Sequence, residues 1–410
     1  MKNLILFTML PFCIFSQEIE CELSWNTNLQ LESNNLNQGF LNSITNGTFI
    51  SNEMVDNWIN NSTGNNNIIN SEVINSFEYF IKFDSLHIGI SISDNNLLNS
   101  SFSNDLLKFA FKGNFLYQDV NLDFGGTNLR ASRYQQYKLT FGKEYNNYKF
   151  SSSISYLAGN HHLSYIIQQG NLYTATYGSY LDIGYNINAF VTDTSNFSIF
   201  ANNGNGLAFD FITDFKIQKY NIHFSLTNLG YINWSKSSIT FAADSSFNFD
   251  GILIDDIFNF NDSILENSTE LDDLPDTKNN IFKSYIPANI NFNITGNSKF
   301  KYLKQYTVGI IAKWQPYTDD KPLSFTKINQ GFKESNFKTL YFINSIIKTK
   351  YCDMIPKISY GGYSDKANIG LAFSKGKKNK VIIGTHHLQE LLNGDQSTSL
   401  SFYLKLIKSF

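Results

Sequence analysis

Charge and cysteine are scarce in this chain. Only 16% of its 410 residues are charged, and 32 basic residues stand against 35 acidic ones, which excludes a broadly basic nucleic-acid binder. Three cysteines exclude a scaffold held together by disulfides. The aromatic content of 16%, combined with so little charge, also excludes a disordered chain or a coiled coil.

Long hydrophobic runs are also lacking beyond the first residues, so the sequence predicts no transmembrane helix, which needs about twenty apolar residues. At the start, a lysine precedes the apolar stretch from Leu4 to Phe15, and the small residue Ser16 precedes a polar segment. This arrangement is typical of a secretory signal peptide, so we expect residues 1–16 to be removed. A lipid anchor at Cys13 is disfavoured because a bulky phenylalanine precedes it.

From about residue 74 to the end of the chain, apolar and polar side chains alternate with a period of two. The pattern is clear in residues 220–227, 286–294, 366–373 and 400–406. Many such stretches match the roughly nine to eleven residues that a tilted strand needs to cross a bilayer. A soluble sandwich would bury these apolar faces, whereas a membrane barrel turns them toward lipid and closes on itself. We therefore predict an all-β fold for residues 74–410, an antiparallel transmembrane β-barrel of about 14–16 strands.

Residues 17–73 have a weaker pattern and are rich in Asn, Ser and Glu. We expect them to form an N-terminal leader, either a plug in the barrel or a periplasmic segment. Residues 50–59 are expected to form a short helix capped by Ser51. A second helix is expected over residues 103–112, capped by Ser103, in a connection between strands or in the lumen.

The two arginines of the chain are the first candidates for a site. Arg130 and Arg133 lie three residues apart at the start of an alternating stretch. Guanidinium groups fixed in a lumen can bind anions or tether a plug carboxylate. The alternative is an ordinary salt-bridged or solvated pair at the beginning of a strand.

The stretch 237–277 is acidic and contains no Lys or Arg. Clustered carboxylates suit hard cations such as Ca²⁺, which makes four of its residues weak candidates for a cation loop. These four are Asp255, Asp256, Asp272 and Asp273. Their spacing matches no calcium-loop pattern, so a solvated acidic loop is the favoured interpretation and no metal site is assigned.

Motifs of known enzyme chemistry are missing from the sequence. It contains no Gly-x-Ser-x-Gly elbow, no phosphate loop and no Cys-x-x-Cys zinc pattern, so we expect neither an enzyme nor a cofactor. Cys21 and Cys352 remain after cleavage, and their separation gives no sign that they pair. The chain ends on Phe410 directly after an alternating stretch, and this terminal aromatic residue is expected to act as an insertion signal for the barrel-assembly machinery.

Several segments resemble a known family in the order in which they occur. Residues 204–210 resemble a Gly-x-Gly strand start, residues 226–234 (Leu-Thr-Asn-Leu-Gly-Tyr-Ile-Asn-Trp) resemble an Asp-Leu-Gly-Phe-Ile-x-Trp pattern with Asn228 in place of Asp, and residues 360–363 fit a penultimate strand. This order is similar to that of an uncharacterised family of Bacteroidota outer-membrane barrels, broadly like the FadL and PorV group in architecture. The resemblance implies location and fold only.

Two functions remain open at this stage. The first is a channel or carrier in the outer membrane for small molecules, including hydrophobic ones. The second is a structural or accessory barrel of a secretion or surface-assembly system, which binds partner proteins. The expected surroundings are outer-membrane lipid and the barrel-assembly machinery, with a small hydrophobic ligand or a secretion partner and no nucleic acid. An open polar lumen would favour the channel, whereas a plugged lumen would not conduct.

Overall fold

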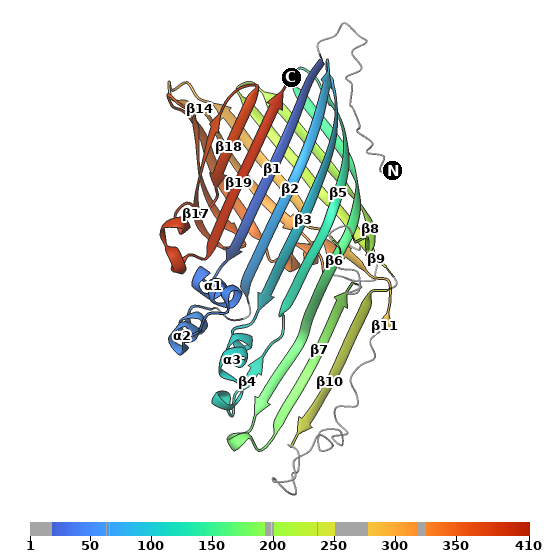
Figure 1. Ribbon diagram of the computed structural model, residues 1–410, viewed down its shortest axis with the longest axis vertical. Helices are drawn as coiled ribbons and strands as arrows, with labels where there is room; N and C mark the ends of the chain where they lie inside the picture. Colours follow the sequence, from blue (N-terminus) through green and yellow to red (C-terminus); the bar gives the residue numbers. More distant parts are fainter. Residues whose placement is uncertain are drawn as a thin grey trace, which may run out of the picture.

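The computed structural model describes residues 19–62, 64, 66–192, 198, 201–235, 237–250, 278–317 and 325–410. Among these residues, 14 antiparallel strands form a closed barrel (Figure 1). In order around the wall they are β1 (Ile19–Ser33), β2 (Asn67–Phe83), β3 (Leu86–Phe102), β5 (Asn128–Glu144), β6 (Tyr148–Thr174), β8 (Gly204–Ile217), β9 (Tyr220–Trp234), β13 (Ala288–Asn297), β14 (Leu303–Trp314), β15 (Lys338–Lys348), β16 (Asp353–Gly362), β17 (Lys366–Lys375), β18 (Asn379–Thr385) and β19 (Ser399–Ser409). The predicted fold class is confirmed.

The first and last strands close the wall. β1 pairs with β19 from Glu22 opposite Ser409 to Glu32 opposite Ser399, and it pairs with β2 along its other edge. Closure leaves no unpaired strand edge between these two strands, as a hydrocarbon environment requires. The expected boundary after residue 73 is therefore wrong, because β1 and the first residues of β2 belong to the barrel wall. Within the expected leader, residues 19–33 and 67–73 form part of the wall, and the residues between them form the connection from β1 to β2.

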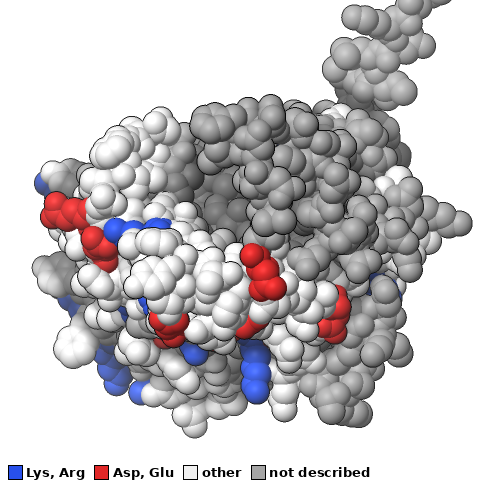
Figure 2. All heavy atoms as spheres, turned by 90° about the horizontal axis from the view of Figure 1, so that it is seen from below, with Lys and Arg blue, Asp and Glu red and all other residues white. Residues whose placement is uncertain are grey.

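The two ends of the barrel differ in their connections. At one end, which we call the short-turn end, the strands are joined by tight turns, and the C-terminus lies there too (Figure 1). At the other end, the long-connection end, the segments 34–66, 103–127, 315–337 and 386–398 join neighbouring strands. Figure 2 looks onto this end and shows acidic and basic side chains scattered over its described surface.

Short helices lie in these long connections. The connection from β1 to β2 holds α1 (Gln38–Asn46) and α2 (Asn52–Asn61), and the other helices are α3 (Asn104–Lys112) before β5 and α5 (Phe325–Glu334) before β15. The hydroxyls of Ser51 and Ser103 accept hydrogen bonds from the third backbone N–H after them, at 3.2 and 3.1 Å, so both predicted helices and their caps are confirmed. Within the described ranges, no helix is long and apolar enough to cross a membrane.

An extension of the sheet projects beyond the barrel at the long-connection end. β6 runs past the wall, and its outer half pairs with β4 (Asn121–Asp123) and β7 (Leu181–Val191). β7 pairs in turn with β10 (Ile239–Phe249), and β10 pairs with the short strand β11 (Lys278–Asn279). The short strand β12 (Lys283–Tyr285) pairs with β9 of the wall. Figure 1 shows the lower part of β6 extending below the closed wall with β7 and β10 beside it.

The outer face of the wall is apolar and the inner face is polar. Large apolar side chains at alternating positions are strongly exposed, for example Ile343 at 57% and Ile358 at 64%. Their strand neighbours Asn344 and Lys357 point to the other face and line a cavity inside the barrel. Apolar side chains so exposed on strand after strand suit contact with hydrocarbon, as expected for a transmembrane barrel.

Candidate functional site

The lumen near the short-turn end is a hollow chamber with charged walls. Its volume is about 830 Å³, and inward positions of β1, β2, β5, β6 and β8 line it. The charged residues that line it are Glu20, Glu22, Glu78, Lys82, Lys138, Lys149, Asp210, Asp214 and Lys378. The wall therefore suits water and polar solutes rather than hydrocarbon.

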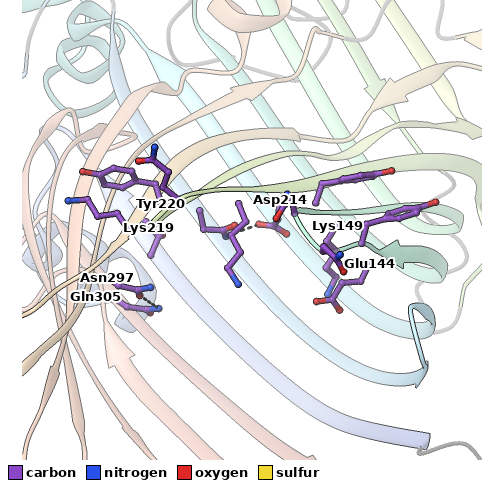
Figure 3. A pocket seen from close by; sticks show the side chains of 15 residues that line it. Glu144, Lys149, Asp214, Lys219, Tyr220, Asn297 and Gln305 are labelled. Carbon is purple, nitrogen blue, oxygen red and sulfur yellow. Dashed lines mark hydrogen bonds between the residues drawn. The ribbon is translucent and has the colours of Figure 1, made fainter.

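The rim of this chamber continues into a pocket of about 470 Å³ between three hairpins of the short-turn end (Figure 3). Lys149 and Asp214 line both spaces, so the pocket and the chamber adjoin. Asp214 accepts a hydrogen bond from His223 Nδ1 at 2.8 Å. Glu144 lies on the side of the pocket away from Tyr220, and its carboxylate is 3.1 Å from Lys82 Nζ. Charged groups of both signs thus surround the mouth of the barrel.

A buried ion pair crosses the lumen beyond the chamber. Lys313 on β14 pairs with Glu72 on β2, and their side chains are only 12% and 9% exposed. The ammonium of Lys313 also lies 5.3 Å from the ring centre of Phe337 and 4.9 Å from that of Tyr363. β2 and β14 are seven strands apart around a wall of 14, so they face each other directly. Because two side chains bridge them, the opposite walls approach each other here, and the lumen is constricted.

Arg130 holds the connection between β14 and β15 against the inner wall. Its guanidinium donates to the backbone oxygens of Gln315, at 2.9 Å, and Glu334, and to Asn99 Oδ1 at 3.3 Å. The group also lies over the ring of Tyr317, 4.3 Å from its centre. A buried guanidinium with these partners fixes the connection over the long-connection end of the lumen.

Two tyrosines beside these basic groups stay neutral. Burial raises the pKa of Tyr363 to about 12, and it raises the pKa of Tyr317 well above the usual range. Both residues lie in connections outside the strands. Their rings therefore face Lys313 and Arg130 as uncharged aromatic faces, which attract a cation through the ring quadrupole.

The structure places the two candidate arginines on opposite faces of β5. Arg130 faces the lumen and tethers a connection through backbone carbonyls, not through a plug carboxylate. Arg133 points to the outer face, where its guanidinium lies 3.2 Å from Asp94. The expectation that Arg133 belongs to the lumen is therefore wrong, because residues three apart on a strand lie on opposite faces. Anion binding by Arg130 stays a prediction.

The remaining candidates from the sequence do not form a site within the described residues. Asp255, Asp256, Asp272 and Asp273 lie outside the described residues. The backbone N–H of Phe410 donates to the carbonyl of Cys21 at 2.9 Å, which ties the chain end to β1, while its role in insertion stays a prediction. Cys21 and Cys352 are free thiols. Within the described ranges, no group of three His, Cys, Asp or Glu residues is placed to hold a metal ion.

The wall is irregular where β18 ends. β18 pairs with β17 only from Leu371 onward and with β19 only up to Tyr403. Beyond Thr385, the segment 386–398 stands in place of a continuing strand, between residues 366–370 and 399–402. We call this place the seam. Side-chain hydrogen bonds bridge part of the seam. Ser401 Oγ accepts a hydrogen bond from the backbone N–H of residue 386 at 2.7 Å and lies 3.1 Å from Thr385 Oγ1.

Cavities lie on both faces of the wall at the seam. An outer pocket of about 520 Å³ is lined by apolar side chains that include Leu29, Phe373 and Phe402. An inner cavity of about 230 Å³ lies among lumen-facing residues of β14, β15, β16 and β19. Leu371 and Thr385, which pair with each other across β17 and β18, line both spaces. These two residues therefore lie between the outer pocket and the inner cavity.

A buried contact holds the segment 386–398 in the seam. His387 is 2% exposed, its Nδ1 lies 2.9 Å from Asn368 Oδ1 on β17, and its Nε2 lies 2.9 Å from the Glu32 carboxylate on β1. The amide of Asn368 donates to Ser364 Oγ at 2.8 Å, so its oxygen faces the imidazole and Nδ1 carries a proton. His387 thus links β17, on one side of the seam, to β1, which lies beyond β19 on the other side.

Sequence reasoning missed the basic residues that matter most inside the barrel. Lys313 and Lys357 each follow an apolar run and occupy a position whose parity places them in the lumen. A lysine at an inward position of a strand, with apolar residues on either side, is a sequence signal for a cation in the lumen. Glu72, the partner of Lys313 on the opposite wall, has no such signal.

Solved structures that match the chain include a FadL homologue, a toluene transporter and a monoaromatic hydrocarbon channel. A FadL homologue of Pseudomonas aeruginosa matches with a TM-score of 0.42 and 9% identity, over 97% of this chain and 90% of that chain. The toluene transporter TbuX of Ralstonia pickettii matches with a TM-score of 0.40 and 7% identity, over 95% and 88%. A mutant of TodX, a monoaromatic hydrocarbon channel, matches with a TM-score of 0.43 and 8% identity, over 96% and 90%.

No curated protein sequence matches the chain. The sequence profile of a family of unknown function (DUF5723) matches residues 22–350, which run from the first strand of the barrel into the turn after β15. This match covers most of the chain. The chain therefore belongs to the family of unknown function DUF5723.

Proposed function

We propose that the protein is an outer-membrane carrier for small, largely apolar molecules, which pass between the lipid and the lumen through the seam. The short turns face the periplasm in this proposal. The observation that carries it is the pair Leu371 and Thr385, which lines an apolar pocket on the lipid-facing side and a cavity on the lumen side. A molecule that enters the outer pocket from the membrane has these two residues between it and the inner cavity.

The constricted lumen supports a carrier over an open pore. The Lys313–Glu72 pair crosses the barrel, and Arg130 fixes the connection from β14 to β15 beyond it. A polar solute moving straight along the barrel axis would have to separate a buried ion pair. A molecule that enters from the side at the seam does not have to do so.

A second function keeps support from the sheet that projects past the wall. β6, β7 and β10 form a surface outside the membrane barrel, with hydrogen-bonded polar pairs such as Asn186 with Asp244 at 3.0 Å and Asn248 with Asp182 at 2.7 Å. A platform of this kind suits a partner protein at the cell surface. An accessory barrel for secretion or surface assembly is therefore the alternative.

The test of the carrier is a lock across the seam. Thr385→Cys with Ser401→Cys places two thiols where hydroxyls now lie 3.1 Å apart, and the free cysteines at 21 and 352 are changed to serine. Uptake of a small apolar fluorescent probe into proteoliposomes should fall when this pair is oxidised and return on reduction. The matched control is Thr140→Cys with Ser153→Cys, a hydroxyl pair 2.8 Å apart on the regular β5–β6 ladder.

The two hypotheses predict different outcomes of this experiment. If the protein is a carrier, oxidation of the Thr385→Cys, Ser401→Cys pair should slow uptake, and oxidation of the Thr140→Cys, Ser153→Cys control pair should not. Equal uptake by locked and unlocked protein, at the rate of empty liposomes, would reject the carrier and favour the accessory barrel. A steady conductance of the wild-type protein in planar bilayers would contradict the constricted lumen.

A further inference from the structure

The inner cavity at the seam combines one cation with aromatic and aliphatic walls. Phe342 and Tyr403 supply rings, Ile311 and Ile355 supply aliphatic surface, and Lys357 with Asn344 supply the polar groups. The residues come from β14, β15, β16 and β19, so the cavity is built by several strands of the wall. A purely apolar ligand would leave the amine of Lys357 and the amide of Asn344 unused.

Lys357 has no acidic partner within the described part of the chain. Its ammonium lies 5.4 Å from the ring centre of Phe342, and the described residues place no carboxylate within ion-pair distance of it. The Glu32 carboxylate is instead in contact with His387 Nε2, at 2.9 Å. An ammonium group that faces a cavity in this way is an anchor for an anion from outside the chain.

The histidine of the same cavity adds no second charge. Burial is the main reason why the pKa of His386 is lowered to about 3, and the positive charge of Lys357 acts in the same direction. His386 is therefore neutral near pH 7, and its ring stacks on Tyr403 with 4.8 Å between ring centres. The cavity thus presents a single positive charge, which matches a ligand with a single negative charge.

The size of the cavity limits the rest of the ligand. A volume of about 230 Å³ is the space of roughly eight water molecules at about 30 Å³ each, and it is smaller than the roughly 300 Å³ at which drug-sized sites begin. A ligand of about eight to ten non-hydrogen atoms fits it. A long alkyl chain does not.

We propose that the inner cavity binds small aromatic monocarboxylates, of the size of benzoate. The carboxylate pairs with Lys357 and accepts a hydrogen bond from the side-chain amide of Asn344, while the ring lies between Phe342, Tyr403 and the aliphatic wall. This assignment rests on the proposed function for the route by which the ligand reaches the cavity, but binding itself does not require transport. The positive charge, the aromatic walls and the volume of the cavity together define this class of ligand.

Calorimetric titration of the purified full-length protein in detergent tests this site. Benzoate should bind saturably, and benzyl alcohol, which has the same shape without the charge, should bind at least about tenfold more weakly because charge-assisted hydrogen bonds are the strong ones. Decanoate, which exceeds the cavity, should also bind more weakly than benzoate. These three ligands are compared on the wild-type protein, so the result does not depend on the folding of a variant.

Variants at position 357 locate the site. Lys357→Met should weaken benzoate at least about tenfold and leave benzyl alcohol unchanged, whereas Lys357→Arg should retain binding. Lys405→Met is the matched control, because Lys405 occupies a strand position with the parity of Tyr403 but does not line this cavity. Benzoate that binds no better than benzyl alcohol, or that binds Lys357→Met as tightly as wild type, would overturn the proposal.

The outcome separates this proposal from the carrier. Binding of benzoate that depends on Lys357, combined with uptake that ignores the seam lock, would keep the site and reject the carrier. Uptake that responds to the lock, without saturable benzoate binding, would keep the carrier and reject the site.

Discussion

The ion pair between Lys313 and Glu72 offers the most quantitative test of the lumen. Both side chains are about nine-tenths buried, at 12% and 9% exposure. Replacing one partner leaves the other as an uncompensated buried charge, which costs about 3–5 kcal/mol. Lys313→Met should reach this range, because the hydrogen bond that the Asn70 amide donates to the Glu72 carboxylate is long, at 3.4 Å.

Glu72→Gln should cost less than Lys313→Met. Lys313 keeps the faces of Phe337 and Tyr363, at 5.3 and 4.9 Å from their ring centres. Each such contact contributes about 0.5–2 kcal/mol, so a loss of about 2–3 kcal/mol is expected for this variant. The double variant with methionine at both positions removes both charges and should lie within about 1 kcal/mol of wild type, since an apolar replacement of a buried pair is often neutral.

Urea unfolding in lipid vesicles, followed by tryptophan emission, measures these differences. The double variant should also raise the single-channel conductance, because nothing charged then bridges β2 and β14. Single variants that each change the free energy of unfolding by less than about 0.5 kcal/mol would show that the pair is solvated. A double variant whose loss equals the sum of the single losses would show that the two residues do not interact.

Three further predictions concern the lipid face, the tethered connection and the chain end. Ile290→Lys should impair folding into liposomes by about 2–4 kcal/mol if the residue lies near the bilayer centre, while Asn291→Lys on the lumen face should fold normally; equal folding of the two would reject the assignment of faces. Arg130→Met should destabilise the fold by about 2–4 kcal/mol and speed proteolysis of the connection between β14 and β15, and an unchanged cleavage rate would remove the tether. Deletion of Phe410 should lower the amount of protein assembled in cells, and an unchanged level would dismiss the insertion signal.

Local patterns accounted for most of what the sequence predicted correctly. The period of two identifies a strand and its lipid face from neighbours alone, as at Ile290 and Asn291, and Ser51 and Ser103 cap their helices through groups only three residues away. β1 was missed although Leu23 and Trp25 show the same alternation, because Thr27 interrupts it.

Contacts between distant strands could not be predicted in this way. Glu72 and Lys313 are 241 residues apart in the chain, and the closure of β1 on β19 joins its two ends. The seam depends on where β18 stops relative to β17 and β19, which is a property of three strands together. The parity of Arg133, by contrast, was available from the sequence, since an odd spacing from Arg130 places the two side chains on opposite faces.

The central claim is that the apolar outer face of the barrel contacts hydrocarbon. Trp25 on β1 is 45% exposed, whereas the other three tryptophans, Trp58, Trp234 and Trp314, are at most 7% exposed. Quenching of tryptophan emission by lipids brominated on their acyl chains measures this contact directly. We predict strong quenching that Trp25→Phe abolishes. Emission from Trp25 that brominated lipid leaves unchanged and that aqueous acrylamide quenches would contradict the claim.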